Sequence, residues 1–363
     1  MNRDTRSLLG TSIINGAGSL PLHLSPLIIA VLMADGTGTM EAGGSRAMVL
    51  IGQLTTATGL PLLTGKQIGR GHTAIAAIVM ITGLAISGSW LLTGWFLIGL
   101  SCGVLGYLAT LTAAVNSNPS HAFLVRLGVT LCIAGTVAAA FNLMPLSSYT
   151  MLVFTLSGAL IFLLTVGMGL QLPLEIPKPK PRTRQESRRV YFVLGLLFLL
   201  FVGQNGQLAY VLRQAGERGI SLGQAVWALA LIKVLAGVIL LALRNRRLSL
   251  WLLATGGAAA NVTVATTTSV PVFVVGLLGL DLIFCLMAPK LQAMAAELAP
   301  VFTGKWSLPI LLLGGAAGTM LHGLMIEHGQ PFLYVAVLTA VLPITLILER
   351  TYENRRSVRQ SGT

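Results

Sequence analysis

Twelve long apolar stretches follow one another along this chain, each near the length that crosses a lipid bilayer. About 20 residues of helix span the ~30 Å hydrocarbon core. The backbone finds no water there, so each stretch must satisfy its own hydrogen bonds as a helix. The expected spans are 8–33, 43–65, 72–91, 93–115, 121–144, 149–170, 190–212, 222–243, 248–267, 269–289, 306–326 and 331–349. This pattern predicts an all-α membrane protein with 12 transmembrane helices.

The composition indicates the same class. Hydrophobic residues make up 54% of the chain and charged residues only 10%, whereas about a quarter of the residues of a soluble domain are charged. The connections are short, so no separate soluble domain is expected. The first stretch, 8–33, is too long and too rich in proline and polar residues for a cleaved signal peptide. We expect it to be a retained helix.

The formal net charge of +13 follows from where the basic residues lie. With a cytoplasmic N-terminus, twenty of the 24 lysines and arginines fall in cytoplasmic segments, the side that keeps positive charge in membrane proteins. We therefore expect a multi-pass protein of the cell (inner or plasma) membrane with both termini in the cytoplasm. The charge favours contact with anionic headgroups of the lipid bilayer, and no nucleic-acid partner is expected.

The longest cytoplasmic connection, LEIPKPKPRTRQESRR, is basic and rich in proline, which predicts an extended linker. It divides the chain into a six-helix bundle at 1–172, a linker at 173–189 and a second six-helix bundle with a cytoplasmic tail at 190–363. Halves with equal numbers of spans indicate an internal repeat. In transporters built this way, the substrate binds in a central cavity between the two halves.

A short alignment between the halves agrees with a repeat. When Gly43 of the second span is placed on Gly223 of the eighth, Gln53 falls opposite Lys233. The two side chains would then lie at similar depth on related helices. Gln53 becomes a candidate for solute contact on this ground, although hydrogen bonding between helices explains it equally well.

Lys233 and Asp281 are charged residues near the centres of two spans. A charge at the bilayer centre costs roughly 2.5–3.5 kcal/mol on insertion scales, so such residues usually serve a function. A buried carboxyl such as Asp281 can load and release a proton during transport, and Lys233 can attract an anionic group of a solute. The alternative is a static ion pair that holds two helices together.

The first span carries a polar stripe. Asn15, Ser19 and His23 follow one another at intervals of four residues, and therefore share one face of a helix that Pro21 and Pro26 loosen. Irregular helices of this kind are tolerated where they line a cavity. We identify Asn15 and His23 as candidates for solute binding; a hydrogen-bonded packing histidine is the alternative.

The seventh span carries three amides, of which Gln204 and Gln207 share a face while Asn205 points elsewhere. Gln204 and Gln207 are candidates for solute contact, with interhelical hydrogen bonding as the alternative. Tyr107, central in the fourth span, is a further candidate, although aromatic core packing explains it as well. Arg126 lies near the start of the fifth span, and we expect its guanidinium to reach back to the cytoplasmic interface, with a role in substrate binding as the alternative.

The architecture resembles the major facilitator superfamily: twelve spans, a central basic linker and a basic glycine-containing loop between spans two and three. The family signature in that loop runs GxLxDRxGRR. The corresponding residues here are Leu62, Thr64, Lys66, Gln67, Gly69, Arg70 and Gly71. Only Gly69 and Arg70 match, and Lys66 replaces the family's aspartate. The resemblance implies two halves that rock about a central cavity, with Lys66, Gly69 and Arg70 in a gating loop.

Enzyme and cofactor motifs are not evident. The segment GLPLLTGKQ has five residues between its glycines, where a phosphate-binding loop needs four, and no ATP site is expected. The three cysteines, Cys102, Cys132 and Cys285, lie inside spans without the spacing of a metal site, so we interpret them as packing residues. We expect no enzyme activity, no cofactor and no metal, and a monomer.

The favoured function is a secondary active transporter that moves a small organic solute by alternating access. The cationic candidates, Lys233 and His23, outnumber the carboxylate Asp281, which favours an anionic or zwitterionic solute. The coupling ion is expected to be H⁺, and export is slightly favoured over import. A membrane-embedded enzyme or lipid-handling protein, and a non-transporting sensor or assembly factor on the same fold, are the alternatives.

Overall fold

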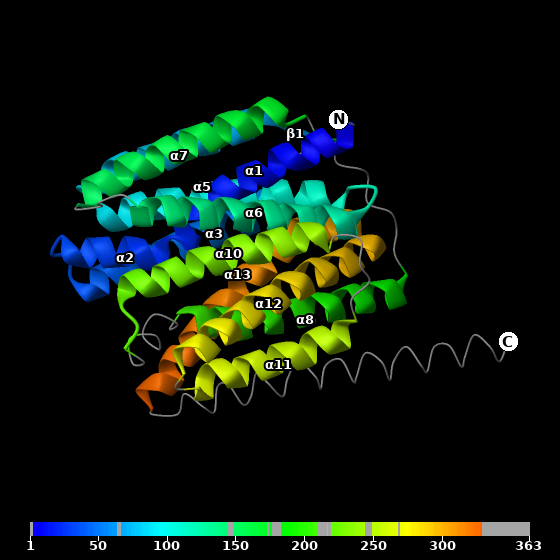
Figure 1. Ribbon diagram of the computed structural model, residues 1–363. Helices are drawn as coiled ribbons and strands as arrows, with labels where there is room; N and C mark the ends of the chain where they lie inside the picture. The colour runs from blue at the N-terminus through cyan, green and yellow to red at the C-terminus, as the bar shows by residue number, and fades with distance from the viewer. Residues whose placement is uncertain are drawn as a thin grey trace.

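The computed structural model describes residues 3–63, 67–143, 148–172, 174–175, 183–209, 216, 219–243, 249–267 and 269–328. The helices among them lie side by side and form an all-α bundle (Figure 1). They are α1 (Arg3–His23), α2 (Ser25–Ala34), α3 (Thr39–Leu63), α4 (Arg70–Ile86), α5 (Leu91–Ala114), α6 (Pro119–Leu143), α7 (Tyr149–Leu170), α8 (Arg184–Ala209), α10 (Leu222–Ala242), α11 (Leu250–Thr266), α12 (Val270–Leu298) and α13 (Pro300–Glu327).

Every expected span has a helical counterpart except the last, 331–349, which lies outside the described residues. The first span consists of two helices, α1 and α2, which meet at Leu24. The bonds from Leu24 N to Leu20 O (2.8 Å) and from Ile28 N to Leu24 O (2.9 Å) continue the helical pattern across the junction. The prolines on either side of Leu24 lack a backbone donor, which explains a break at this point.

Two predicted boundaries are wrong. The linker was expected to extend to residue 189, but α8 begins at Arg184, because Thr183 and Glu186 form a capping box. Its backbone bonds are Thr183 N to Glu186 Oε2 (2.9 Å) and Glu186 N to Thr183 Oγ1 (3.2 Å). The connection expected around Lys290 and Lys305 is helical, since α12 continues to Leu298 and α13 starts at Pro300.

A short antiparallel ribbon adds to the helices. Strand β1 (Gln67–Ile68) pairs with β2 (Leu174–Glu175), with Gln67 opposite Glu175 and Ile68 opposite Leu174. The ribbon joins the connection between α3 and α4 to the chain that follows α7. Two-residue strands are too short to leave a periodic pattern in the sequence, so this pairing was not predicted.

The helices pack as two bundles. Helices α1–α7 share one large apolar core, and α8 and α10–α13 share another, which includes Leu131 of α6. The bundles meet where α6 packs on α10 and α12, and where α13 packs on α3 and α5. Four described helical segments are long and apolar enough to cross a membrane by length and composition: Leu91–Ala114, Pro119–Phe141, Tyr149–Leu170 and Val270–Leu298.

Glycines allow the closest helix contacts. A Cβ atom added at Gly99 of α5 would overlap the carbonyl oxygen of Val49 in α3, and one added at Gly52 of α3 would overlap that of Phe96. The two backbones therefore touch without intervening side chains, as small residues permit in membrane helices. By contrast, a Cβ at Gly158 of α7 would meet nothing within 4 Å.

We expect Gly99→Val to destabilise the protein by about 1–3 kcal/mol or more, because the new side chain must push the α3 backbone away. Gly158→Val is the matched control and should change the stability far less. The unfolding of both variants in detergent micelles, followed by circular dichroism, measures the difference. Equal stability of the two variants would show that the α3–α5 contact tolerates a side chain.

Candidate functional site

A cavity of about 290 Å³ lies between the two bundles. Helices α1, α2, α3, α5 and α6 line it from the first bundle, and α8, α10, α12 and α13 from the second. Its size is close to the lower end of the range for small-molecule sites, which is about 300–1,000 Å³. Most of its wall is apolar, and a few polar and charged side chains interrupt it. This is the composition expected of a pocket that orients a small organic molecule.

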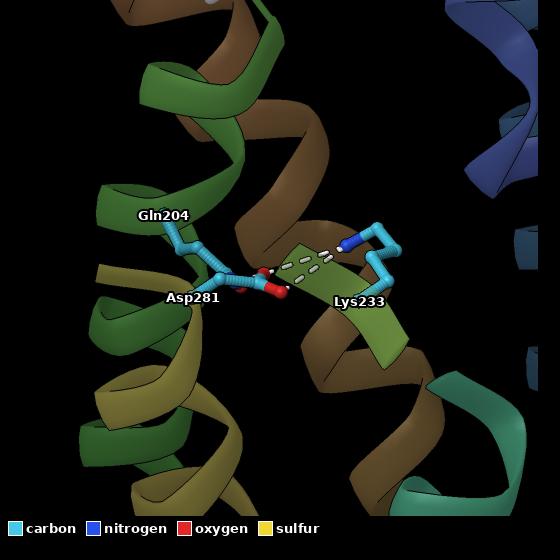
Figure 2. A network of polar contacts seen from close by, with 3 residues as sticks. All are labelled: Gln204, Lys233 and Asp281. Carbon is cyan, nitrogen blue, oxygen red and sulfur yellow. Dashed lines mark hydrogen bonds and ion pairs between the residues drawn. The ribbon is translucent and has the colours of Figure 1, made fainter. Parts of the chain in front are cut away.

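Lys233 and Asp281 form an ion pair on the wall of this cavity (Figure 2). Lys233 Nζ of α10 lies 3.4 Å from Asp281 Oδ2 of α12. Gln204 of α8 donates from Nε2 to Asp281 Oδ1 at 3.3 Å. The Lys233 side chain is 15% exposed and that of Asp281 is 4% exposed. Three helices of the second bundle therefore place one compensated charge pair at the cavity, with the ammonium on its more accessible side.

The polar stripe of the first helix faces the cavity, as its spacing predicts. Asn15, Ser19 and His23 all line the wall. Asn15 Nδ2 donates to Thr130 Oγ1 of α6 at 2.7 Å, which fixes the amide. Gln53 lines the wall from α3, and within the described residues its Oε1 accepts no hydrogen bond. The structure therefore places Gln53 and Lys233 on one cavity, and the repeat between their helices stays a prediction.

Two candidates do not join this group. Tyr107 does not line the cavity: it is fully buried in an apolar cluster with Ala57, Leu308 and Leu312. The prediction that it faces the solute is therefore wrong, because α5 is enclosed by its neighbours and buries this face too. The side chain of Gln207, near the end of α8, lies outside the described part of the structure.

Arg126 lines the cavity, and the prediction that it reaches the membrane interface is wrong. It is only 8% exposed. Its Nη2 donates to Gln292 Oε1 of α12 at 3.0 Å, and its Nη1 donates to Thr110 Oγ1 of α5. Helix α6 packs against both of these helices, so the guanidinium finds polar partners inside the protein. Thr110 lies inside a predicted span, but Gln292 lies beyond the predicted end of its span at residue 289, so the sequence did not indicate this partner.

Two more polar residues on the wall were missed. Asn205 lines the cavity, although its place on the helix was expected to turn it elsewhere. Its Nδ2 donates to Phe201 O at 3.4 Å. Arg46 contributes to the wall from α3. The site is therefore more basic than the sequence indicated.

The cavity is closed at one end, which we call the linker end: there α7 ends at Leu170 and α8 begins at Arg184. An apolar cluster from both bundles fills this end, with Leu8, Ala113 and Phe123 from the first bundle and Ala293 from the second. Lys305 Nζ of α13 donates to Pro61 O of α3 at 3.3 Å. Cross-bundle contacts thus separate the cavity from the linker end.

Comparison with solved structures places this arrangement in a known fold. The human organic anion transporter MFSD10 is 14% identical, with a TM-score of 0.74 over 96% of this chain and 100% of that one. The transporter FucP in its outward conformation is 16% identical, with a TM-score of 0.69 over 95% and 98%. The proton:xylose symporter XylE is 12% identical, with a TM-score of 0.67 over 94% of each chain.

The chain has the major facilitator fold. No protein-family model matches its sequence, and no curated protein does. The major facilitator fold accounts for the two bundles and for the cavity between them. It is present here although most of the signature in the loop after the second span is not.

That loop retains a structural role in this version of the major facilitator fold. Gly69 precedes α4, and Arg70 Nε donates to Gln171 O, just after α7, at 2.9 Å. Thr73 Oγ1 donates to Gln171 Oε1 at 2.9 Å. Arg70 therefore ties two helices of the first bundle together. Lys66 lies outside the described residues, and a gating role for this loop stays a prediction.

The described residues contain no group of three or more histidine, cysteine, aspartate or glutamate side chains that could hold a metal ion. Cys102 and Cys285 are buried and Cys132 is partly buried, and all three are free thiols. The polar chemistry of the cavity thus consists of amides, hydroxyls, an imidazole, basic groups and one carboxylate.

Proposed function

We propose that the protein is a secondary active transporter that moves a small organic anion or zwitterion by alternating access. The observation that carries the proposal is a cavity of about 290 Å³ between two bundles, with charged residues from both on its wall and closed at the linker end. The folds of MFSD10 and XylE, described as an organic anion transporter and a proton:xylose symporter, lend support.

The contact between the bundles suits a rocking motion. Glycines lie at the crossing of α6 and α10: a Cβ at Gly135 would be 2.7 Å from Ala230 O, and one at Gly237 would be 2.7 Å from Cys132 Sγ. The two backbones approach closely at these glycines, and in this proposal α6 and α10 tilt against each other about this crossing. Asp281 is the proposed proton carrier, because it is the carboxylate that lines the cavity.

In this proposal the linker end faces the cytoplasm of a cell membrane, since the basic residues gather on that side. The structure then corresponds to a state closed to the cytoplasm. Protonation of Asp281 weakens its attraction to Lys233 and favours the opposite state. The transporter works as a monomer, with export as the favoured direction.

Distances between the bundles test alternating access without knowledge of the solute. Spin labels at Ser117→Cys and Ser249→Cys report on the linker end, and labels at Ser89→Cys and Ser269→Cys report on the opposite end; all four positions are exposed. The three native cysteines are replaced in the background. Double electron–electron resonance in lipid nanodiscs is recorded at about pH 8 and about pH 3, which lie on either side of the ordinary pKa of a carboxyl group, about 4.

We expect acidification to lengthen the distance at the linker end and to shorten the distance at the opposite end. The pair Arg184→Cys and Ser249→Cys lies within the second bundle and should not change. Distances that stay fixed at both ends, or that change in the same direction, would contradict alternating access driven by protonation.

A further inference from the structure

We infer that Arg126 is the anion-binding group of the cavity and that the solute carries a carboxylate, which binds to this guanidinium. The inference rests on the proposed function only in identifying the ligand as the transported solute. Binding of a carboxylate to Arg126 does not itself require transport. Three properties of Arg126 support the inference: its charge, its free donors, and its place between the bundles.

The first property is the charge of Arg126. Lys233 has Asp281 as a counter-ion, whereas Arg126 has no carboxylate partner among the described residues. Its partners are the neutral side chains of Thr110 and Gln292, and the face of the Phe123 ring, 5.2 Å from the guanidinium carbon. A buried cation without a counter-ion is unfavourable. An anionic ligand at this point of the cavity would supply the missing charge.

The second property is the geometry of the hydrogen-bond donors of Arg126. A guanidinium has five N–H donors, and Arg126 uses two of them within the described residues. Its Nε is buried and has no hydrogen-bond partner there. The planar fork of an arginine matches the two oxygens of a carboxylate better than a single point charge does. Thr130 lies one helical turn further along α6, on the same side, and also lines the cavity.

The apolar wall around Arg126 narrows the class of ligand. Leu127, Leu131, Phe284 and Leu308 line the same cavity. A small organic carboxylate would place its charged group on Arg126 and its apolar body against these side chains. A free inorganic anion would leave this apolar wall in contact with water, which is less favourable.

The third property is the position of Arg126 at a contact between the bundles. Its Nη2 bond to Gln292 joins α6 of the first bundle to α12 of the second. A carboxylate bound to the Nε–Nη2 edge of the guanidinium would share Nη2 with Gln292 Oε1. Ligand binding would therefore weaken one of the contacts that closes the linker end, which links occupancy to opening.

The test is binding to the purified full chain in detergent, without a gradient. The probes are three carboxylates (acetate, lactate and benzoate), their neutral amides (acetamide, lactamide and benzamide), and inorganic phosphate, all at constant ionic strength. The apparent Kd comes from the dependence of the thermal unfolding midpoint on probe concentration. We expect at least one carboxylate to bind, with its amide weaker by about 30-fold or more, the ratio that the loss of a charged hydrogen-bonded pair gives.

Arg126→Gln should raise the Kd of that carboxylate to the value of the amide, whereas Arg184→Gln, a change at an exposed arginine of α8, should leave it unchanged. Arg126→Lys keeps the charge without the fork, so we expect binding to weaken by less than tenfold; this variant serves if the glutamine variant does not fold. Equal binding of amides and carboxylates, no binding of any carboxylate, binding of phosphate alone, or full binding by Arg126→Gln would overturn the inference. Binding without transport in vesicles would leave the inference standing and would contradict the proposed function.

Discussion

Asp281→Asn is expected to abolish the accumulation of solute against its gradient in vesicles with an imposed pH difference. The asparagine keeps the size of the side chain and its hydrogen bond to Gln204, but it cannot carry a proton. Net accumulation should fall by at least tenfold, to about the level of vesicles without protein. Exchange of labelled for unlabelled solute at equal pH needs no proton transfer and should continue. Both rates are measured in proteoliposomes with the small organic acids that bind the wild type.

Asp4→Asn is the matched control, because Asp4 is an exposed carboxylate at the start of α1. It should accumulate solute at the wild-type level. Accumulation at that level by Asp281→Asn would show that the proton binds elsewhere. Loss of accumulation and exchange together would instead assign Asp281 to solute binding or to folding.

The polar residues at the centre of the site could be predicted from the sequence, because a polar or charged side chain inside a membrane span is energetically costly. Lys233, Asp281 and Gln204 interrupt otherwise apolar spans, and the structure brings these three together (Figure 2). A charge in that environment needs a partner, so a lysine and an aspartate at mid-span predict each other. The stripe of Asn15, Ser19 and His23 was predictable for a different reason, namely the regular spacing of a helix.

Arg126 shows what such reasoning misses. Arg126 lies at a distance from the end of its span that allows its guanidinium either to reach the membrane interface or to stay buried. Which of the two occurs depends on the neighbouring side chains. The deciding neighbour, Gln292, is 166 residues away in the sequence. Tyr107 was uncertain for a similar reason: α5 is buried on nearly every side, so an apolar pattern does not tell which face meets the cavity.

The fold itself depends on features that the family signature does not include. Close contacts at Gly52 and Gly99, and apolar cores within each bundle, hold the helices in place. None of these contacts involves the loop signature, so the fold is present with Lys66 in place of an aspartate. The helix start at Arg184 was also readable: Thr183 and Glu186 have the spacing of a capping box, which the proline-rich context obscured.

Removal of one member of the Lys233–Asp281 ion pair is expected to lower the free energy of unfolding more than removal of both members. Lys233→Met leaves the buried carboxylate of Asp281 without its cation, and we expect a loss of about 3 kcal/mol, the lower end of the range for such a change, because the cavity gives the pair some access to water. In the double variant Lys233→Met, Asp281→Asn no net charge stays buried, and the loss should be under about 1.5 kcal/mol. Reversible unfolding in mixed detergent micelles measures both.

The comparison separates a functional pair from a structural one, because the double variant keeps the fold and removes the chemistry. A stable double variant that no longer accumulates solute would show that the two charges serve transport, since the helices need neither of them to pack. If the free energy of unfolding of the double variant falls by the sum of the losses in Lys233→Met and Asp281→Asn, the two charges do not compensate each other. Normal transport by a stable double variant would remove Asp281 from the coupling mechanism and leave His23, the imidazole on the cavity wall, as the titratable group to test next.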